Sequence, residues 1–82
     1  SSRYCPKCKQ TSSVIEDIIR KEGLESYYIP LDITTAYGMK QLRTYDLEVQ
    51  FVPTLIVNCM AYVGQKPAEQ YNNIMKAFKY GH

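Results

Sequence analysis

The chain carries two cysteines, separated by two residues, at the point where its first helix is predicted to begin. The motif Cys5-Pro6-Lys7-Cys8 is followed by apolar residues at helical spacing, namely Val14, Ile15, Ile18 and Ile19. That spacing predicts a helix over residues 8–22, and Gly23 stands where a helix C-cap is expected. Two thiols three positions apart at a helix start can close a small disulfide with little backbone movement. The pair therefore constrains both the fold around it and the chemistry of the chain.

The position of Cys5 favours its thiolate, which is the reactive form of cysteine. Unpaired N–H groups and the positive end of the helix dipole both stabilise an anion there. Lowering a thiol pKa from about 8.5 to about 7 needs about 2 kcal/mol, and an exposed helix end supplies only about 0.3–1 kcal/mol. Lys7, Lys9 and a hydrogen bond to the sulfur must supply the remainder. Cys8 lies one turn further in and should be more buried, so we expect Cys5 to attack and Cys8 to resolve. Pro6 suits the first turn because its missing N–H is not needed there.

Two other interpretations of the cysteine pair stay open. Cys-x-x-Cys is also half of a structural zinc site, but such a site needs four ligands. Only Cys59 and His82 remain as thiol or imidazole ligands, and both are distant in the sequence. Two inert buried cysteines are the other alternative. We favour a redox pair with no bound metal, and we expect Cys59 to be an exposed incidental thiol or, alternatively, a site of intermolecular disulfide formation or redox modification.

The remaining chain alternates predicted strands and helices. Residues 27–33 predict a strand, at an edge or with a bulge because of Pro30, and Thr34 or Thr35 can cap a helix over residues 36–45. Residues 54–57 predict a central strand covered on both faces, and residues 60–63 predict a short strand after a turn that begins at Asn58-Cys59. Because positive φ is costly for Cys59, we also expect a longer turn over residues 58–61 as the alternative. Pro67 should begin a last helix. The side chains expected to point inward from the last two helices are Met39, Leu42, Tyr45, Tyr71, Ile74, Met75 and Phe78.

Length and charge narrow the class of protein. The 82 residues suit one domain over residues 1–82, and the net charge of +2 is too mild for a nucleic-acid groove or a membrane-binding face. The longest apolar run, near residues 51–57, is too short to span a bilayer. Three cysteines is an odd number, whereas a disulfide-stapled secreted domain usually has four or six. We therefore predict a cytoplasmic monomer that binds neither nucleic acid nor membrane.

A proline leads directly into the predicted central strand. Pro53 cannot donate to a strand ladder. Alone, Val52-Pro53 favours a trans proline before an edge strand. Combined with the Cys-x-x-Cys helix start some 45 residues earlier, it favours a cis peptide bond, since cis X–Pro bonds occur in special tight turns.

Taken in order, three motifs resemble the thioredoxin/glutaredoxin superfamily. They are Tyr4-Cys5-Pro6-Lys7-Cys8, Val49-x-x-Val52-Pro53-Thr54-Leu55-Ile56-Val57-Asn58 and Tyr62-Val63-Gly64. The resemblance implies a thioredoxin-like α/β fold of three α/β/α layers around a mixed sheet. It also implies a thiol–disulfide oxidoreductase with Cys5 as nucleophile, Cys8 as resolving thiol and Pro53 as cis proline. The residues that it assigns to substrate binding are Tyr4, Pro6, Lys7, Val52, Pro53 and Thr54.

The resemblance also implies partners. The substrates would be disulfide-containing proteins, ribonucleotide reductase among them, and one would pair with the backbone of Val52 as an added strand. Glutathione or a flavoprotein thioredoxin reductase would act as reductant, with no bound cofactor. The alternative, from another class, is a non-catalytic or zinc-clipped module that binds a partner through the surface around Pro53.

The sequence departs from the family pattern at several places. Family members have a strand before Cys-x-x-Cys in the middle of the sheet, whereas only four residues precede Cys5 here. Either residues are missing upstream, or another segment or chain fills the slot, or the fold is adapted. Of these we favour an N-terminally truncated chain. Gly64 is followed by Gln65 where glutaredoxins have a second glycine and an acid, whereas Tyr4 is glutaredoxin-like, so the subclass stays open. Asp32 is a further candidate, as a carboxylate that relays protons near Cys8.

Overall fold

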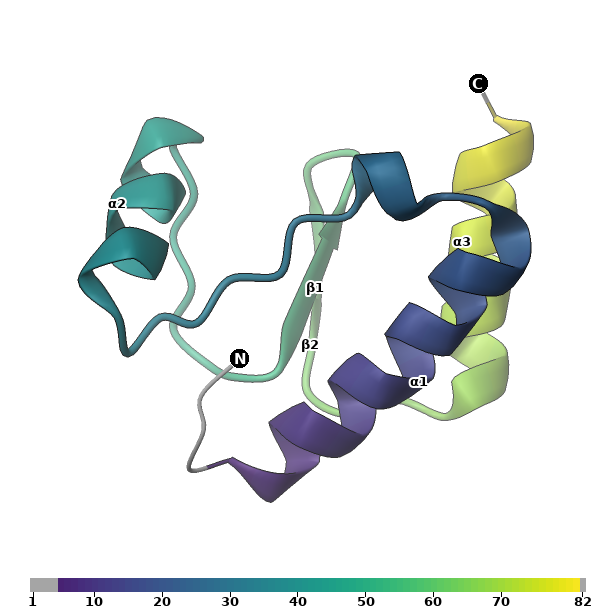
Figure 1. Ribbon diagram of the computed structural model, residues 1–82, viewed down its shortest axis with the longest axis horizontal. Helices are drawn as coiled ribbons and strands as arrows, with labels where there is room; N and C mark the ends of the chain where they lie inside the picture. The colour runs from purple at the N-terminus through teal and green to yellow at the C-terminus, as the bar shows by residue number, and fades with distance from the viewer. Residues whose placement is uncertain (1–4, 82) are drawn as a thin grey trace.

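Residues 5–81 are described by a computed structural model. The elements are α1 (Pro6–Glu22), a 3₁₀ helix (Glu25–Tyr27), α2 (Ala36–Thr44), β1 (Thr54–Val57), β2 (Met60–Val63) and α3 (Ala68–Tyr80). Figure 1 shows the β1–β2 hairpin in the middle, with α1 and α3 on one side and α2 on the other. Among these residues, no helix is both long and apolar enough to cross a membrane.

Helix α1 is bounded by local signals at both ends. It begins at Pro6, two residues earlier than predicted, because Cys5 serves as its N-cap. It ends at Gly23, whose φ of 69° lies in the left-handed region. The N–H of Gly23 donates to Arg20 O at 3.2 Å and that of Leu24 donates to Ile19 O at 2.9 Å. This is a Schellman motif, and it confirms the predicted cap.

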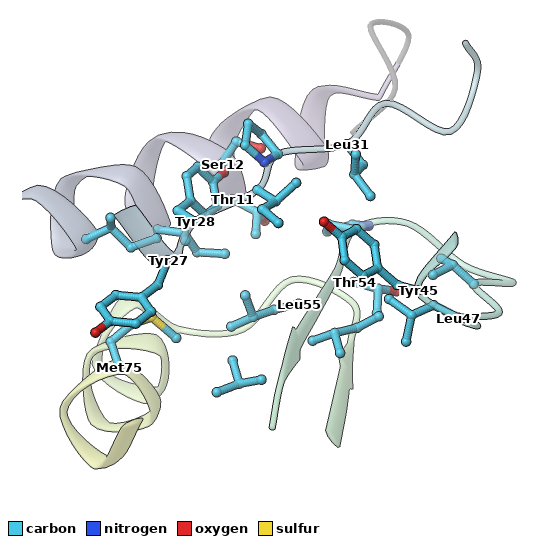
Figure 2. Close-up of a pocket in the computed structure, with 18 of the residues that line it drawn as sticks. Thr11, Ser12, Tyr27, Tyr28, Leu31, Tyr45, Leu47, Thr54, Leu55 and Met75 are labelled. Carbon is cyan, nitrogen blue, oxygen red and sulfur yellow. The ribbon is translucent and has the colours of Figure 1, made fainter. Parts of the chain in front are cut away.

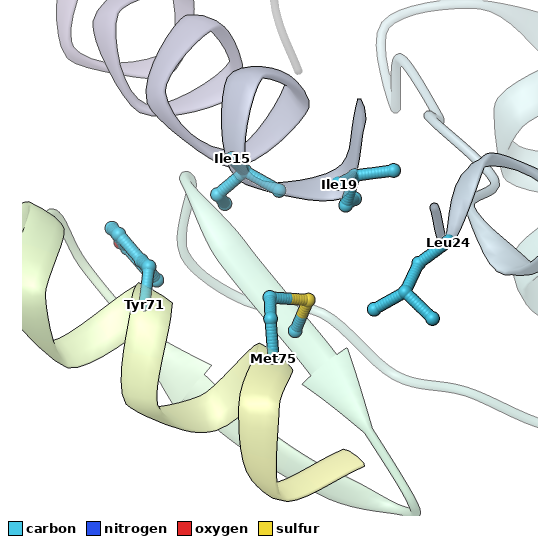
Figure 3. Packing of buried hydrophobic residues seen from close by; sticks show 5 residues of the cluster. All are labelled: Ile15, Ile19, Leu24, Tyr71 and Met75. Carbon is cyan, nitrogen blue, oxygen red and sulfur yellow. The ribbon is translucent and has the colours of Figure 1, made fainter. Parts of the chain in front are cut away.

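The core lies between α1 and α3 (Figure 3). Its buried members are Ile15, Ile19, Leu24, Tyr71 and Met75. Leu55 and Val57 of β1 pack against this cluster, so one face of the hairpin is attached to the two helices. The inward faces predicted for α1 and α3 are confirmed, with Ile74 and Phe78 partly buried at the edge of the cluster.

The predicted strand over residues 27–33 is wrong. The chain forms the 3₁₀ helix to Tyr27 and then runs without regular secondary structure to the turn before α2. A side-chain contact, and not strand pairing, attaches this segment to α1: the Tyr28 hydroxyl donates to Glu16 Oε2 at 3.2 Å. Pro30 adds no ladder donor. The sheet within residues 5–81 is therefore two-stranded and antiparallel, and the expected mixed sheet is not found in this part of the chain.

The predicted burial of β1 is wrong as well. It pairs with β2 along one edge only, and all four of its residues are half-buried. A fully buried strand needs a neighbouring strand at each edge and packed elements, usually helices, on both faces. Within residues 5–81, the second strand neighbour that would make β1 central is missing.

Helix α2 has the predicted cap but not the predicted inward face. Thr35 Oγ1 accepts the N–H of Gly38 at 3.0 Å, and Leu42 is buried. Met39 and Tyr45 are 44% and 50% exposed. Helix α2 stands apart from the hairpin (Figure 1), so few of its side chains have a surface to pack on. Gly38 is needed for space, since a Cβ there would lie 2.0 Å from Asp32 O.

The hairpin turn is the shorter of the two that the sequence predicts. Val57 pairs with Met60, so only Asn58 and Cys59 connect the strands. Their φ angles are 50° and 65°. Positive φ at both central positions defines a type I′ turn, whose twist matches that of the strands. Strand register therefore overrides the poor fit of Cys59 to this conformation.

Replacing Cys59 with glycine should stabilise the protein. Glycine adopts positive φ without the Cβ clash that costs other residues about 1–2 kcal/mol, although its greater freedom in the unfolded chain offsets part of the gain. We expect the free energy of unfolding in urea to rise by about 1 kcal/mol for Cys59→Gly. Cys59→Ser is the matched control, because it removes the thiol and keeps the Cβ. Equal stabilities of the two variants would contradict the backbone explanation.

Candidate functional site

Cys5 caps the helix with its sulfur. Its φ and ψ of −111° and 100° are those of an extended N-cap residue. The Cys8 N–H donates to Cys5 Sγ at 3.1 Å, and the Lys9 N–H donates to Cys5 O at 3.2 Å. In most helices a Ser, Thr, Asp or Asn oxygen accepts this N–H. Here the sulfur of Cys5, which is part of the disulfide, takes that place.

The two cysteines differ in exposure. They are joined in a disulfide with their Cα atoms 5.1 Å apart. Cys8 is fully buried and Cys5 is half-buried. Pro6 and Lys7 are exposed around them, and no acidic residue lies in the first turn of α1 to repel an anion. Cys5 is therefore the more accessible residue of the pair.

The segment Val52-Pro53-Thr54 forms a second part of the candidate site. The Val52–Pro53 bond is cis, as predicted. Pro53 is buried and Val52 is half-buried. The Thr54 hydroxyl donates to Phe51 O and closes the turn that leads into β1. The Gly64 N–H donates to Pro53 O at 2.8 Å, which extends the hairpin ladder by one pair beyond Thr54.

The hydroxyl of Tyr71 helps to hold the cis-proline turn in place, a role that the sequence did not predict. Its hydroxyl donates to Gly64 O at 3.1 Å and accepts the Lys66 N–H at 3.0 Å. The side chain is 1% exposed. The contacts run from Pro53 through Gly64 to Tyr71, so helix α3 fixes the position of the cis-proline turn. The spacing of apolar residues predicted that Tyr71 is buried, but no sequence signal identifies the partners of its hydroxyl.

A cavity of about 520 Å³ borders the cis-proline turn, and neither Cys5 nor Cys8 lines it. Thr11 and Ser12, one turn beyond Cys8 on α1, line it together with Val52 and Pro53. Figure 2 shows Thr11 and Ser12 on the helix and Thr54 and Leu55 across the cavity on β1. The turn before β1 and the first half of α1 therefore face one space.

Tyr28 attaches the segment after the 3₁₀ helix to α1 beside this cavity. Burial, and then the negative charge and hydrogen bond of Glu16, raise the pKa of Tyr28 to about 12. The phenol thus stays protonated and continues to donate to Glu16 across the neutral range.

Other sequence predictions have different outcomes. Tyr4 and His82 lie outside the described residues. Asp32, considered as a proton relay, accepts the N–H and the hydroxyl of Thr34 at 2.9 Å and 2.6 Å and so shapes the turn before α2. Cys59 is exposed at the hairpin turn. Within residues 5–81, no three His, Cys, Asp or Glu side chains gather as metal ligands.

No protein-family model, curated protein or solved structure matches the chain. The function must therefore be inferred from the geometry of the site itself.

Replacing Tyr71 with phenylalanine should destabilise the protein. The change keeps the ring but leaves Gly64 O and the Lys66 N–H without their partner. We expect a loss of about 1–3 kcal/mol in the free energy of unfolding, measured with urea. Tyr80→Phe is the matched control, because that side chain is 75% exposed. A loss of the same size in both variants would show that the Tyr71 hydroxyl has no special role.

Proposed function

We propose that the protein is a thiol–disulfide oxidoreductase that uses Cys5 and Cys8 as its redox pair. The observation that supports this most is the hydrogen bond from the Cys8 N–H to Cys5 Sγ. It places the sulfur of the half-buried Cys5 at the helix N-terminus, where negative charge is stabilised. The fully buried Cys8 lies within bonding distance of it.

The first step is attack by the Cys5 thiolate on one sulfur of a substrate disulfide. A Cys5–substrate bond forms, the substrate S–S bond breaks, and the second substrate sulfur leaves as a thiolate. The Cys8 N–H and the helix dipole hold the attacking sulfur as an anion. No acidic side chain in the first turn opposes this charge.

In the second step Cys8 resolves the mixed disulfide. Its thiol loses a proton to water or to the departing substrate thiolate, and its sulfur attacks Cys5 Sγ. The Cys5–Cys8 bond forms, the Cys5–substrate bond breaks, and the substrate has gained two electrons. The short Cα–Cα distance of 5.1 Å allows this closure without moving the helix. A Cys5–Cys8 disulfide, which the structure contains, is what this step would leave.

The cycle needs an external reductant to restore the two thiols. Two glutathione molecules, or the dithiol of a flavoprotein thioredoxin reductase, would each supply the two electrons. The substrates would be disulfide-containing proteins, and Val52 offers backbone groups beside Pro53 with which an extended substrate segment can pair. The exposed Pro6 and Lys7 would contact the same segment.

We also propose that the fold is thioredoxin-like. The order of elements supports this, with a helix that carries the cysteines first and a hairpin that follows a cis proline later. The placement of α1 and α3 on one side of the hairpin and of α2 on the other is consistent with α/β/α layers (Figure 1). Independently of this proposal, residues 5–81 form a small mixed structure with three α-helices and a two-stranded antiparallel sheet.

The two cysteines should react at different rates. In reduced protein at pH 7, we expect Cys5 in a Cys8→Ser variant to be alkylated by iodoacetamide about tenfold faster than Cys8 in a Cys5→Ser variant. Both variants carry Cys59→Ser, so that the exposed third thiol does not contribute. Mass spectrometry of the modified peptides gives the rates.

An assay of disulfide reduction and a measurement of bound zinc also test the proposed function. The protein with both cysteines should reduce a protein disulfide when coupled to glutathione and its reductase, or to a thioredoxin reductase, and the Cys5→Ser variant should not. Equal, slow alkylation and no reduction with either system would contradict the proposal. About one zinc ion per purified chain would favour the zinc-clipped binding module instead.

A further inference from the structure

Thr11 carries a buried hydroxyl that has no hydrogen bond. The residue lies in α1, one turn beyond Cys8, and is 4% exposed. Among residues 5–81, its Oγ1 has neither a donor nor an acceptor as partner. Buried polar atoms of side chains nearly always have one, so this exception needs an explanation.

The usual partner of a helical threonine is not used at this position. A threonine hydroxyl inside a helix commonly donates to the carbonyl three or four residues earlier. In α2, Thr44 Oγ1 donates in this way to Lys40 O at 2.9 Å. Thr11 makes no such bond to Lys7 O or Cys8 O. Its hydroxyl is therefore available to a side chain on the same face of α1.

Cys8 is the side chain that this hydroxyl can meet. Helical residues three apart are neighbours, with about 5–6 Å between their Cβ atoms, and a helical side chain leans over the turn that precedes it. Thr11 therefore leans toward Cys8, which is fully buried. While the disulfide is closed, the sulfur of Cys8 is bonded to Cys5. Opening the disulfide frees the Cys8 sulfur to rotate about its Cα–Cβ bond.

The proposed resolving step needs Cys8 as a thiolate, and its surroundings oppose that charge. Cys8 is fully buried, and burial disfavours a charged sulfur. The N–H of Cys8 donates to Cys5 Sγ and so stabilises the other sulfur of the pair. A hydroxyl donor in the same buried space would replace the hydrogen bonds that water gives to an exposed thiolate.

We propose that the Thr11 hydroxyl donates a hydrogen bond to the sulfur of Cys8 when the Cys5–Cys8 disulfide is open, an inference that rests on the proposed function. In the resolving step, the Cys8 thiol still loses its proton to water or to the departing substrate thiolate, and Thr11 keeps its own proton. The hydrogen bond stabilises the Cys8 thiolate until its sulfur bonds to Cys5. Closure of the disulfide removes the charge, which is consistent with an unpaired hydroxyl in the disulfide-bonded structure.

The charged groups around this turn do not replace the hydroxyl. On α1, Lys7 and Lys9 are exposed, and solvent screens their charges. From the connection between β2 and α3, the neutral amide of Gln65 donates to Gln10 Oε1 at 3.1 Å, and the half-buried Lys66 follows it. The titratable side chains that line the cavity beside Thr11 are Tyr27, Tyr28, Tyr45 and Cys59. Variants of Thr11 keep all the charges of the chain, so a change in Cys8 reports on the hydroxyl.

The first test is a ¹³C NMR pH titration of the Cys8 Cβ in reduced protein that carries Cys59→Ser. We expect the midpoint of Cys8 ionisation to lie about one pH unit higher in Thr11→Val, a tenfold change that is typical of a lost hydrogen bond to a charged group. Thr11→Ser keeps the hydroxyl and should ionise as the chain with Thr11 does. An unchanged midpoint in Thr11→Val would overturn the proposal, and so would an equal rise in Thr11→Ser.

The second test follows the resolving step by stopped flow. Reduced protein reacts with dithiobis(nitrobenzoate), which releases one coloured thiolate when Cys5 attacks and a second when Cys8 resolves. At pH 7 we expect the second phase to be about threefold slower in Thr11→Val, because the lost thiolate fraction outweighs the gain in nucleophilicity. Above both ionisation midpoints, the variant should be about threefold faster. A second phase that is slowed equally at every pH would indicate disturbed packing and contradict the proposal.

These measurements separate the inference from the proposed function. The titration needs no activity, so a higher midpoint in Thr11→Val with no reduction of protein disulfides by the unmodified chain would refute the redox proposal alone. Reduction of protein disulfides with the same Cys8 ionisation in both proteins would refute the role of Thr11 alone. In the disulfide-bonded state, Thr11→Val should not lower the urea midpoint of unfolding, because a methyl group replaces an unpaired buried hydroxyl. A lower midpoint would show that the hydroxyl is already paired and would overturn the inference.

Discussion

The hydrogen bond from the Cys8 N–H to the sulfur of Cys5 is the contact on which the site depends. A sulfur occupies the place of a capping oxygen, so the same contact that begins α1 at Pro6 also fixes the sulfur at the positive end of the helix. One turn of helix then carries Cys8 into full burial while Cys5 keeps contact with solvent. The different roles proposed for the two thiols follow from this local geometry.

The second part of the site is held by the same core. Ile15 and Ile19 of α1 pack against Tyr71 and Met75 of α3, and the Tyr71 hydroxyl holds Gly64, which in turn holds Pro53. The cysteine helix and the cis-proline turn are thus attached to one helix pair. The structure is less complete on the side of α2, where a cavity lies between well-packed elements and the edge of β1 is open. The well-packed side carries the proposed chemistry.

The sequence predicts those structural features that depend on residues close together in the chain. The apolar spacing and Gly23 predict α1. The cis bond at Pro53 is an exception, because its prediction depends on the cysteine pair some 45 residues earlier in the chain. Predictions failed where the result depends on distant partners. Residues 27–33 have strand-like composition, but within residues 5–81 they have no strand neighbour. Met39 stays exposed because α2 has little to pack on. Cys59 takes positive φ because strand register leaves only two residues for the turn. The role of the Tyr71 hydroxyl could not be predicted, because its partners are backbone atoms that only the fold brings together.

The central claim is that the sulfur of Cys5 is held as an anion at the start of α1. The most direct measurement is a ¹³C NMR pH titration of the two cysteine Cβ atoms in reduced protein that carries Cys59→Ser. The account predicts that at pH 7 the Cβ shift of Cys5 is mainly that of a thiolate, while the shift of Cys8 is that of a thiol. Thiol shifts for both residues at pH 7, with ionisation of both only in the alkaline range of free cysteine, would contradict it.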